Sequence, residues 1–226
     1  ISMKLTKFRR NCGKSYPEDH LEDTKLPYLL KYNKTITKSV TQFMVGLFKN
    51  EIFNSPKTIV LKNYHRMSVE FELAFELSER IIDPSIQRNP ENIVHDILNV
   101  LPAIELIDDR GANYDGLDPL SLACDNAWSG GLVLGDPINN WQEKDFLDIQ
   151  STCEWNNEPR LTTGVLDAKP FENLCWLINE LHSRKSELKP GMIIITGSVF
   201  KVRQAKVGDK INHILSDNGK VSITVI

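Results

Sequence analysis

The 226-residue sequence lacks the closely spaced cysteines and histidines that are typical of zinc-binding and disulfide-rich proteins. Its four cysteines are far apart and never form a Cys-x-x-Cys pair, which argues against a structural zinc site or a disulfide scaffold. Its five histidines are equally scattered and form no His-x-x-x-His pair that could hold zinc. Any metal ion would therefore have to be held mainly by carboxylates.

Long apolar runs and an excess of positive charge are missing as well. The densest apolar run, residues 192–195, is far shorter than the roughly 18 residues that span a bilayer, so no membrane partner is expected. A net charge of −3 offers no basic footprint for nucleic acid. No apolar segment follows the basic residues near the start of the chain, so we expect no secretory signal and a cytoplasmic protein with reduced thiols.

The most informative feature that the sequence does contain is a strand-like segment with carboxylates on one face. Across residues 69–77 every second residue is apolar, and Glu70 and Glu72 fall between them, as in a half-buried β-strand. The two glutamates would share a face, with Cα atoms roughly 6.5–7 Å apart. At that spacing they can converge on one hard divalent cation. The alternative is a solvent-facing edge strand that its charges keep soluble.

A third glutamate stands in an otherwise apolar segment. Residues 103–107 read Ala-Ile-Glu-Leu-Ile, which predicts a buried strand in which Glu105 is the exception. A carboxylate in such surroundings is costly unless it is paired, hydrogen-bonded or bound to a cation. Glu105 is therefore a better individual candidate for a functional residue than Glu70 or Glu72.

The remaining patterns predict strands with a few helices between them. Strands are expected at residues 58–61, 69–77, 103–107, 131–135 and 192–196, with a closing hairpin at 210–215 and 221–225. Helices are expected at residues 40–48, at 89–101 and at 170–181, where Cys175 would be a core residue. This order indicates an α+β fold with a largely antiparallel sheet system. An irregular N-terminal arm or lid (1–55) would precede one domain (56–226).

Several short motifs occur in a fixed order along the chain. They are VEFELAF (69–75), LPAIE (101–105), ACDNA (123–127), WL (176–177), LKPGMIIITGS (188–198) and VGD (207–209). Together they resemble the fumarylacetoacetate hydrolase superfamily, and within it the group of 2-keto-4-pentenoate hydratases and 4-oxalocrotonate decarboxylases. The resemblance covers residues 56–226 and implies a β-rich mixed roll with a few flanking helices.

The resemblance also implies a chemistry. The Glu-x-Glu pair and a third acidic residue of this superfamily bind Mg²⁺ or Mn²⁺, and the matching residues here are Glu70, Glu72 and Glu105. The cation chelates the carboxylate and keto oxygens of a small 2-oxo acid and stabilises the enolate that forms when a proton is moved. The implied function is a metal-dependent lyase, specifically a hydratase of 2-hydroxy-dienoic acids, and a homo-oligomer is expected.

The segment Thr196-Gly197-Ser198 resembles the superfamily's loop beside the substrate carboxylate, which makes these residues candidates for substrate binding. Its serine is similar to that of the hydratases in this position. Judged from the residues alone, the segment fits a turn that ends a strand equally well.

The chain lacks the residues that transfer protons in this family. The lysine motif and the acidic segment of the family's N-terminal part are absent, and Met44 falls where the acid would be. A thioether cannot carry that proton. Farther along, Trp128 stands in place of a serine of the hydratases, and Ser129 comes one residue later.

Two residues are candidates for the missing proton-transfer groups. Lys34 (or Lys38) could replace the lysine, and Asp125 could serve as the acid; the alternatives are a surface lysine and an aspartate that caps a turn. These departures keep two further functions open. One is a degenerate family member that binds a ligand or partner without catalysis, and the other is a related 2-oxo-acid decarboxylase or hydrolase.

Overall fold

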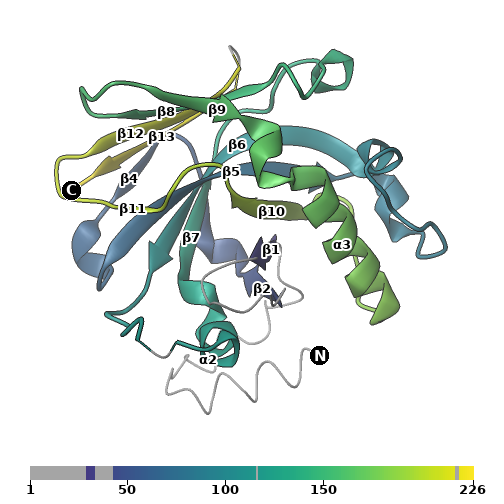
Figure 1. The fold of residues 1–226 in the computed structure, drawn as a ribbon, viewed down its shortest axis with the longest axis horizontal. Coiled ribbons are helices and arrows are strands. Elements are labelled where there is room, and N and C mark those ends of the chain that lie inside the picture. The colour runs from purple at the N-terminus through teal and green to yellow at the C-terminus, as the bar shows by residue number, and fades with distance from the viewer. Residues whose placement is uncertain (1–28, 34–42, 116, 217–218) are drawn as a thin grey trace.

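The computed structural model describes residues 29–33, 43–115, 117–216 and 219–226, which form two packed β-sheets and one long helix (Figure 1). The large sheet contains, in spatial order, β2 (Phe43–Leu47), β1 (Leu29–Asn33), β10 (Ile193–Ser198), β5 (Met67–Leu77), β6 (Ile97–Asp108), β7 (Ser129–Leu134) and β3 (Ile52–Asn54), and β11 (Arg203–Gln204) also pairs with β5. The small sheet contains β4 (Lys57–Ile59), β13 (Gly219–Val225), β12 (Lys210–Leu215), β8 (Gln150–Trp155) and β9 (Leu161–Gly164). The helices are α2 (Pro119–Cys124) and α3 (Pro170–Ser183).

Most neighbouring strands are antiparallel, and the parallel pairs are β1–β10, β3–β7 and β4–β13. The predicted α+β fold with a β-rich mixed sheet system is therefore confirmed. All predicted strands are present, although β6 begins at Ile97, six residues before the predicted start at residue 103. Strands β1, β2 and β3 precede residue 56 and join the large sheet, and the division of the chain at residue 55 stays a prediction.

The core between the sheets is formed by alternate residues of β5 and β6 packed on the small sheet. Its members include Val69, Phe71, Ile104, Leu106, Trp155, Ile211 and Ile223. Because side chains alternate across a strand, the residues between these core positions point to the other face of the large sheet. Glu70, Glu72 and Glu105 are among them. The same period that builds the core thus places all three glutamates on one face.

Helix α3 covers another part of the large sheet and lies beside β10 (Figure 1). Pro170 stands in its first turn, and its buried stripe includes Leu174, Cys175 and Ile178, as the spacing predicted. Burial raises the pKa of the Cys175 thiol to about 12. The prediction that Cys175 is a core residue is confirmed.

Two of the predicted helices are wrong. Residues 43–47 form strand β2, paired along its whole length with β1, while residues 40–42 lie outside the described residues. Residues 97–101 belong to β6, and only a 3-10 turn at Ile93–Asp96 precedes them. In both places the apolar spacing suited a helix, but backbone pairing with a distant strand decided the structure.

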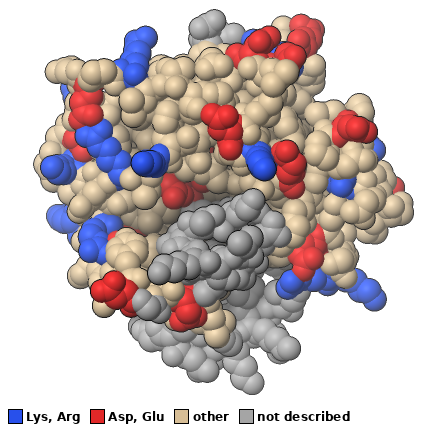
Figure 2. All heavy atoms as spheres, in the orientation of Figure 1, with Lys and Arg blue, Asp and Glu red and all other residues tan. Residues whose placement is uncertain are grey.

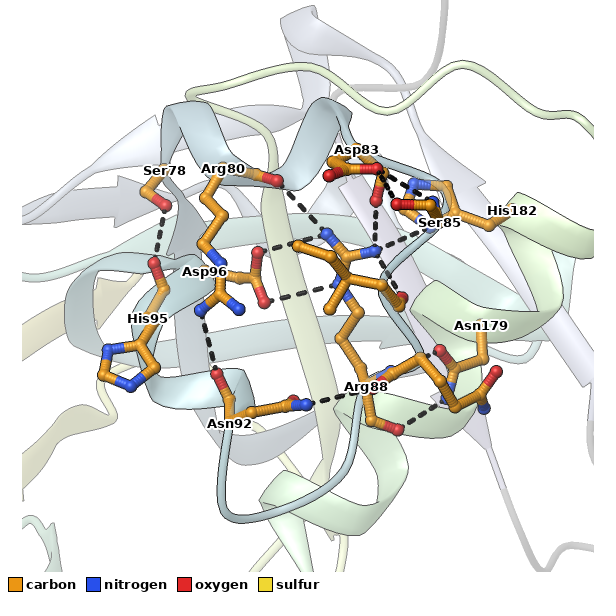
Figure 3. A network of polar contacts seen from close by, with 12 residues as sticks. Ser78, Arg80, Asp83, Ser85, Arg88, Asn92, His95, Asp96, Asn179 and His182 are labelled. Carbon is orange, nitrogen blue, oxygen red and sulfur yellow. Dashed lines mark hydrogen bonds and ion pairs between the residues drawn. The ribbon is translucent and has the colours of Figure 1, made fainter.

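A buried arginine explains why the segment before β6 takes an irregular path (Figure 3). Arg88 is only 2% exposed, forms an ion pair with the equally buried Asp96, and donates to the backbone carbonyls of Arg80, Asp83 and Ile86. The side chain of Asn179 on α3 hydrogen-bonds to the backbone N–H and carbonyl of Arg88. These contacts tie the segment to α3 and satisfy backbone groups that a helix would otherwise pair.

The surface is mixed in charge on the face that Figure 2 shows, where basic side chains are interspersed with acidic ones. Among the described residues, no helix combines the length and the apolar character needed to cross a bilayer.

Candidate metal centre

The three predicted metal ligands meet on the central strand pair. Glu70 of β5 lies directly opposite Glu105 of β6 in the antiparallel register, and Glu72 lies two residues along on the same face. One carboxylate oxygen from each lies within 4.8 Å of the others. Glu72 and Glu105 are fully buried, and Glu70 is partly exposed. The pairing of β5 with β6 thus gathers carboxylates that are up to 35 residues apart in sequence.

The alternative of a solvent-facing edge strand does not hold for this pair. Strand β5 has β10 on one side and β6 on the other, so neither of its edges is open at Glu72. A buried carboxylate needs a compensating charge or hydrogen bonds, and here two of them stand beside a third. The cluster is therefore an unusual feature of the core, not a charged surface strip.

A backbone N–H approaches Glu72 from the neighbouring strand β10. The N–H of Gly197 donates to Glu72 Oε2 at 2.6 Å. Strand β10 is irregular at this point, since its register against β5 shifts between Ile195 and Ser198. Gly197 adopts a φ of +123°, a conformation that L side chains rarely take, so glycine is required by the backbone here.

A serine approaches Glu105 from the other side, on strand β7. Ser129 is 4% exposed, and its Oγ donates to Glu105 Oε1 at 3.2 Å. Sequence reasoning noted Ser129 only as displaced from a family position and gave it no role. The pairing of β6 with β7, which no local pattern reveals, brings the two residues together.

The three residues of the predicted substrate loop have different environments. Thr196 is buried, and its Oγ1 has no hydrogen-bond partner within the described part of the chain. Its backbone carbonyl accepts a hydrogen bond from Asn173 on α3 at 3.0 Å. The Ser198 hydroxyl accepts from the N–H of Phe71 and donates to the carbonyl of Phe200, so it holds the loop together. The loop lies beside Glu72, while its role toward a substrate stays a prediction.

The candidate proton-transfer groups are Asp125 and Lys34 (or Lys38). Asp125 forms an ion pair with Arg110, at 2.8 Å, near the far end of β6. Lys34 and Lys38 lie outside the residues that the structure describes. Met44 lies on β2, partly buried against the core that α3 shares. The geometry therefore joins the three glutamates with the 196–198 loop, and it ties Asp125 to another partner.

The residues fit a divalent metal ion. Hard cations such as Mg²⁺ prefer oxygen ligands, and the cluster offers three carboxylates, of which two are shielded from water. A cation between them offsets both the mutual repulsion and the burial cost of the charges. Donors from Gly197 and Ser129 already orient two of the carboxylates, as partners of metal ligands commonly do.

Comparison with solved structures defines the class of fold. The chain superimposes on 4-oxalocrotonate decarboxylase from Pseudomonas putida G7, complexed with magnesium and adipate, with a TM-score of 0.79, covering 100% of this chain and 98% of that one at 16% identity. A fumarylacetoacetate hydrolase family protein from Yersinia pestis CO92 matches with a TM-score of 0.60 at 18% identity, covering 88% of this chain and 92% of that chain. The fold is that of the fumarylacetoacetate hydrolase superfamily.

Curated relatives narrow this class. A 2-oxo-hept-4-ene-1,7-dioate hydratase of Escherichia coli is 31% identical over 192 residues, covering 78% of this chain and 68% of that protein. A 2-keto-4-pentenoate hydratase of Paraburkholderia xenovorans is 26% identical over 179 residues, covering 78% of this chain and 65% of that protein. No protein-family model matches the sequence. The chain belongs to the 2-keto-4-pentenoate hydratase family, and it spans about two thirds of the length of these two relatives.

Proposed function

We propose that the protein is a hydro-lyase that depends on Mg²⁺ or Mn²⁺ and adds water to a 2-hydroxy-dienoic acid, the enol form of a 2-oxo acid. The observation that carries this proposal is the cluster of Glu70, Glu72 and Glu105 in the centre of a hydratase-family fold. When bound, the cation would act as a Lewis acid on the oxo-acid oxygens and favour the charge that develops when a proton moves.

The chain's own residues would prepare this site. Glu70, Glu72 and Glu105 would hold the cation, and the Gly197 N–H would keep the Glu72 carboxylate in place. The buried Thr196 hydroxyl, next to Gly197, would donate to the substrate carboxylate. Hydroxyls and backbone N–H groups at such positions are suited to a carboxylate because they donate without adding net charge.

Apolar side chains on the same face would receive the hydrocarbon part of the substrate. Ala74 and Ala103, each two residues from a glutamate of the cluster, pack with Leu132 and Ile195. Ile107, two residues beyond Glu105 on β6, belongs to a second apolar cluster. Such walls exclude water and strengthen the electrostatic contacts made inside the site.

Proton transfer to and from the substrate would need groups other than the metal ligands. Lys34 and Asp125 are the candidates, and Asp125 would have to leave its ion pair with Arg110 to take part. This ion pair, with Met44 where the family has an acid, supports a second candidate function: a family member that binds metal and a 2-oxo acid without turning it over. The homo-oligomer and the cytoplasmic location expected from the sequence stay predictions.

The test is an activity assay on the purified full chain. The metal-depleted protein receives Mg²⁺ or Mn²⁺ and either 2-hydroxypenta-2,4-dienoate or a seven-carbon diacid analogue, and the loss of the dienoate ultraviolet absorbance is followed. A product heavier by one water, seen by mass spectrometry, supports the hydratase, whereas loss of carbon dioxide identifies a decarboxylase. Turnover should disappear with chelator and in Glu105→Gln. It should persist in Glu76→Gln, which changes a carboxylate of β5 that accepts a hydrogen bond from Asn99.

Two outcomes would contradict the hydratase proposal. Absence of turnover of every dienoate with either metal would refute it, and binding of oxalate to the metal-loaded protein in the same experiment would support the non-catalytic candidate. Turnover that survives both chelation and Glu105→Gln would refute the role of the metal cluster.

A further inference from the structure

Strand β7 begins after a short segment with an uncommon backbone. Asn126, Ala127 and Trp128 have φ angles of +52°, +50° and +60°, so three consecutive residues other than glycine occupy the left-handed region. Such a run persists only where the surroundings hold it. Here the Asn126 amide donates to the Gly46 carbonyl at 2.8 Å, and the buried Trp128 ring packs edge-on against Tyr114.

This run determines where the next residue points. Ser129 returns to an extended backbone, with φ −60° and ψ 125°, and opens β7 opposite Ile107. The register then shifts, so that Gly131 lies opposite Leu106 and Gly130 is the extra residue of a bulge. A Cβ at Gly130 would come within 3.1 Å of the Leu106 carbonyl oxygen, so a side chain at this position would crowd the bulge.

The result is a buried hydroxyl aimed at one carboxylate of the cluster. Ser129 Oγ donates to Glu105 Oε1 at 3.2 Å, just as the Gly197 N–H donates to Glu72 on the opposite side. The two fully buried glutamates of the cluster therefore each accept a hydrogen bond from a neighbouring strand. A carboxylate that accepts such a bond has fewer orientations available, which lowers the cost of holding it in place for a cation.

We infer that Ser129 is a positioning residue of the metal centre: its hydroxyl orients the Glu105 carboxylate and thereby raises the affinity for the cation. This inference rests on the proposed function, because it requires that the three glutamates bind a metal ion. The left-handed run and the Gly130 bulge are the structural means by which β7 delivers this hydroxyl.

The test measures metal affinity directly, without substrate. Mg²⁺ binding is measured by isothermal titration calorimetry, and Mn²⁺ binding by the loss of the free-ion electron paramagnetic resonance signal. Ser129→Ala and Ser129→Cys should bind either ion about 10- to 100-fold more weakly than the natural protein. Ser129→Cys preserves the side-chain volume and carries only a weak donor, so it keeps the test valid even where the alanine variant folds poorly. Ser129→Thr keeps the hydroxyl, so its Kd for either ion should stay within about threefold of that of the natural protein. This change is much smaller than the roughly 10- to 100-fold loss expected when the partner of a metal ligand is removed.

A matched control is available in the small sheet. Ser151 is fully buried and hydrogen-bonds to His213 at 2.7 Å, so Ser151→Ala removes a comparable bond and should leave the metal affinity unchanged. Natural affinity in both Ser129→Ala and Ser129→Cys would overturn the inference and leave the proposed function standing. If the natural protein binds neither ion, the proposed function fails and this role fails with it.

Discussion

The replacement of Glu105 by glutamine should change stability in opposite directions with and without metal. Without a cation, carboxylate oxygens of Glu70, Glu72 and Glu105 lie within 4.8 Å of one another. Two unit charges at that separation repel by about 3.5 kcal/mol at an effective dielectric constant of about 20. Glutamine keeps the shape and can still accept the bond from Ser129, but it removes one charge. We expect metal-free Glu105→Gln to be more stable than the metal-free natural protein by about 1–3 kcal/mol.

With metal the order should reverse. A ligand that binds only the folded state stabilises it by about 2.7 kcal/mol at a hundredfold excess over its Kd. For a chain of this length that corresponds to a rise in Tm of about 5–11 °C, since each kcal/mol shifts Tm by about 2–4 °C. The natural protein should show this rise with Mg²⁺ or Mn²⁺, and Glu105→Gln should show almost none.

The assay is urea and thermal unfolding in chelator and in excess Mg²⁺, for the natural protein and two variants. Glu76→Gln is the control, because Glu76 lies on β5 and on the same face as Glu70 and Glu72, but accepts its hydrogen bond from Asn99. It should keep the full metal response. A natural protein whose stability is identical in chelator and in metal would refute the reasoning, as would a Glu105→Gln variant that is destabilised in chelator and still responds to metal.

Three further predictions concern groups around the site and in the core. Burial lowers the pKa of His213 to about 4, so the folded state holds its imidazole neutral. The free energy of unfolding should therefore fall by about 3 kcal/mol as the pH drops from 6.5 to 4. Urea unfolding of His213→Gln should lack this part of the decrease. Arg88→Met leaves the buried Asp96 without its ion pair and should lower the free energy of unfolding in urea by about 3–5 kcal/mol. The double variant Arg88→Met/Asp96→Leu should be more stable than Arg88→Met alone. Equal stabilities of the two variants would contradict this account. Gly197→Ala places a residue with a Cβ at a φ of +123° and should displace the backbone N–H that donates to Glu72, which should weaken Mg²⁺ binding about tenfold in calorimetry. Unchanged binding would contradict the requirement for glycine at this position.

The glutamate cluster could be predicted from the sequence because strand parity is a local property. Glu70 and Glu72 share a face by alternation alone, and Glu105 is conspicuous because its neighbours are apolar. Helix α3 was predictable for a similar reason: Pro170 marks its start and its apolar stripe repeats over several turns. The shared face of Glu70 and Glu72 and the course of α3 each depend on one short segment. The meeting of Glu105 with the pair depends on the pairing of β5 with β6 and was expected from the family resemblance.

The segments that were predicted wrongly depend on distant partners. The stripe at residues 93–101 required Leu98 to be buried, yet Leu98 is 49% exposed in β6, where the chain alternates against β5. Five residues of β2 bury Val45 and Leu47 in alternation, which is too short a pattern to outweigh a helical spacing. The pairing of β2 with β1 and the hydrogen bonds between Arg88 and Asn179 on α3, both made with other segments of the chain, decided these conformations.

The support of the two buried glutamates could not be predicted either, and its origin is the same at both. The donor to Glu72 is 125 residues away on β10, and the donor to Glu105 is 24 residues away on β7. Each donor lies where the strand register shifts, at Ile195/Ser198 in β10 and at Leu106/Ile107 beside β7. A regular strand would direct those groups along the ladder, whereas a bulge re-aims them. The two paired strands β5 and β6 thus supply the three glutamates. The irregularities beside them, in β10 and β7, supply the donors that orient Glu72 and Glu105. Substitutions at Gly197 or Ser129 should therefore change metal affinity more than they change the fold.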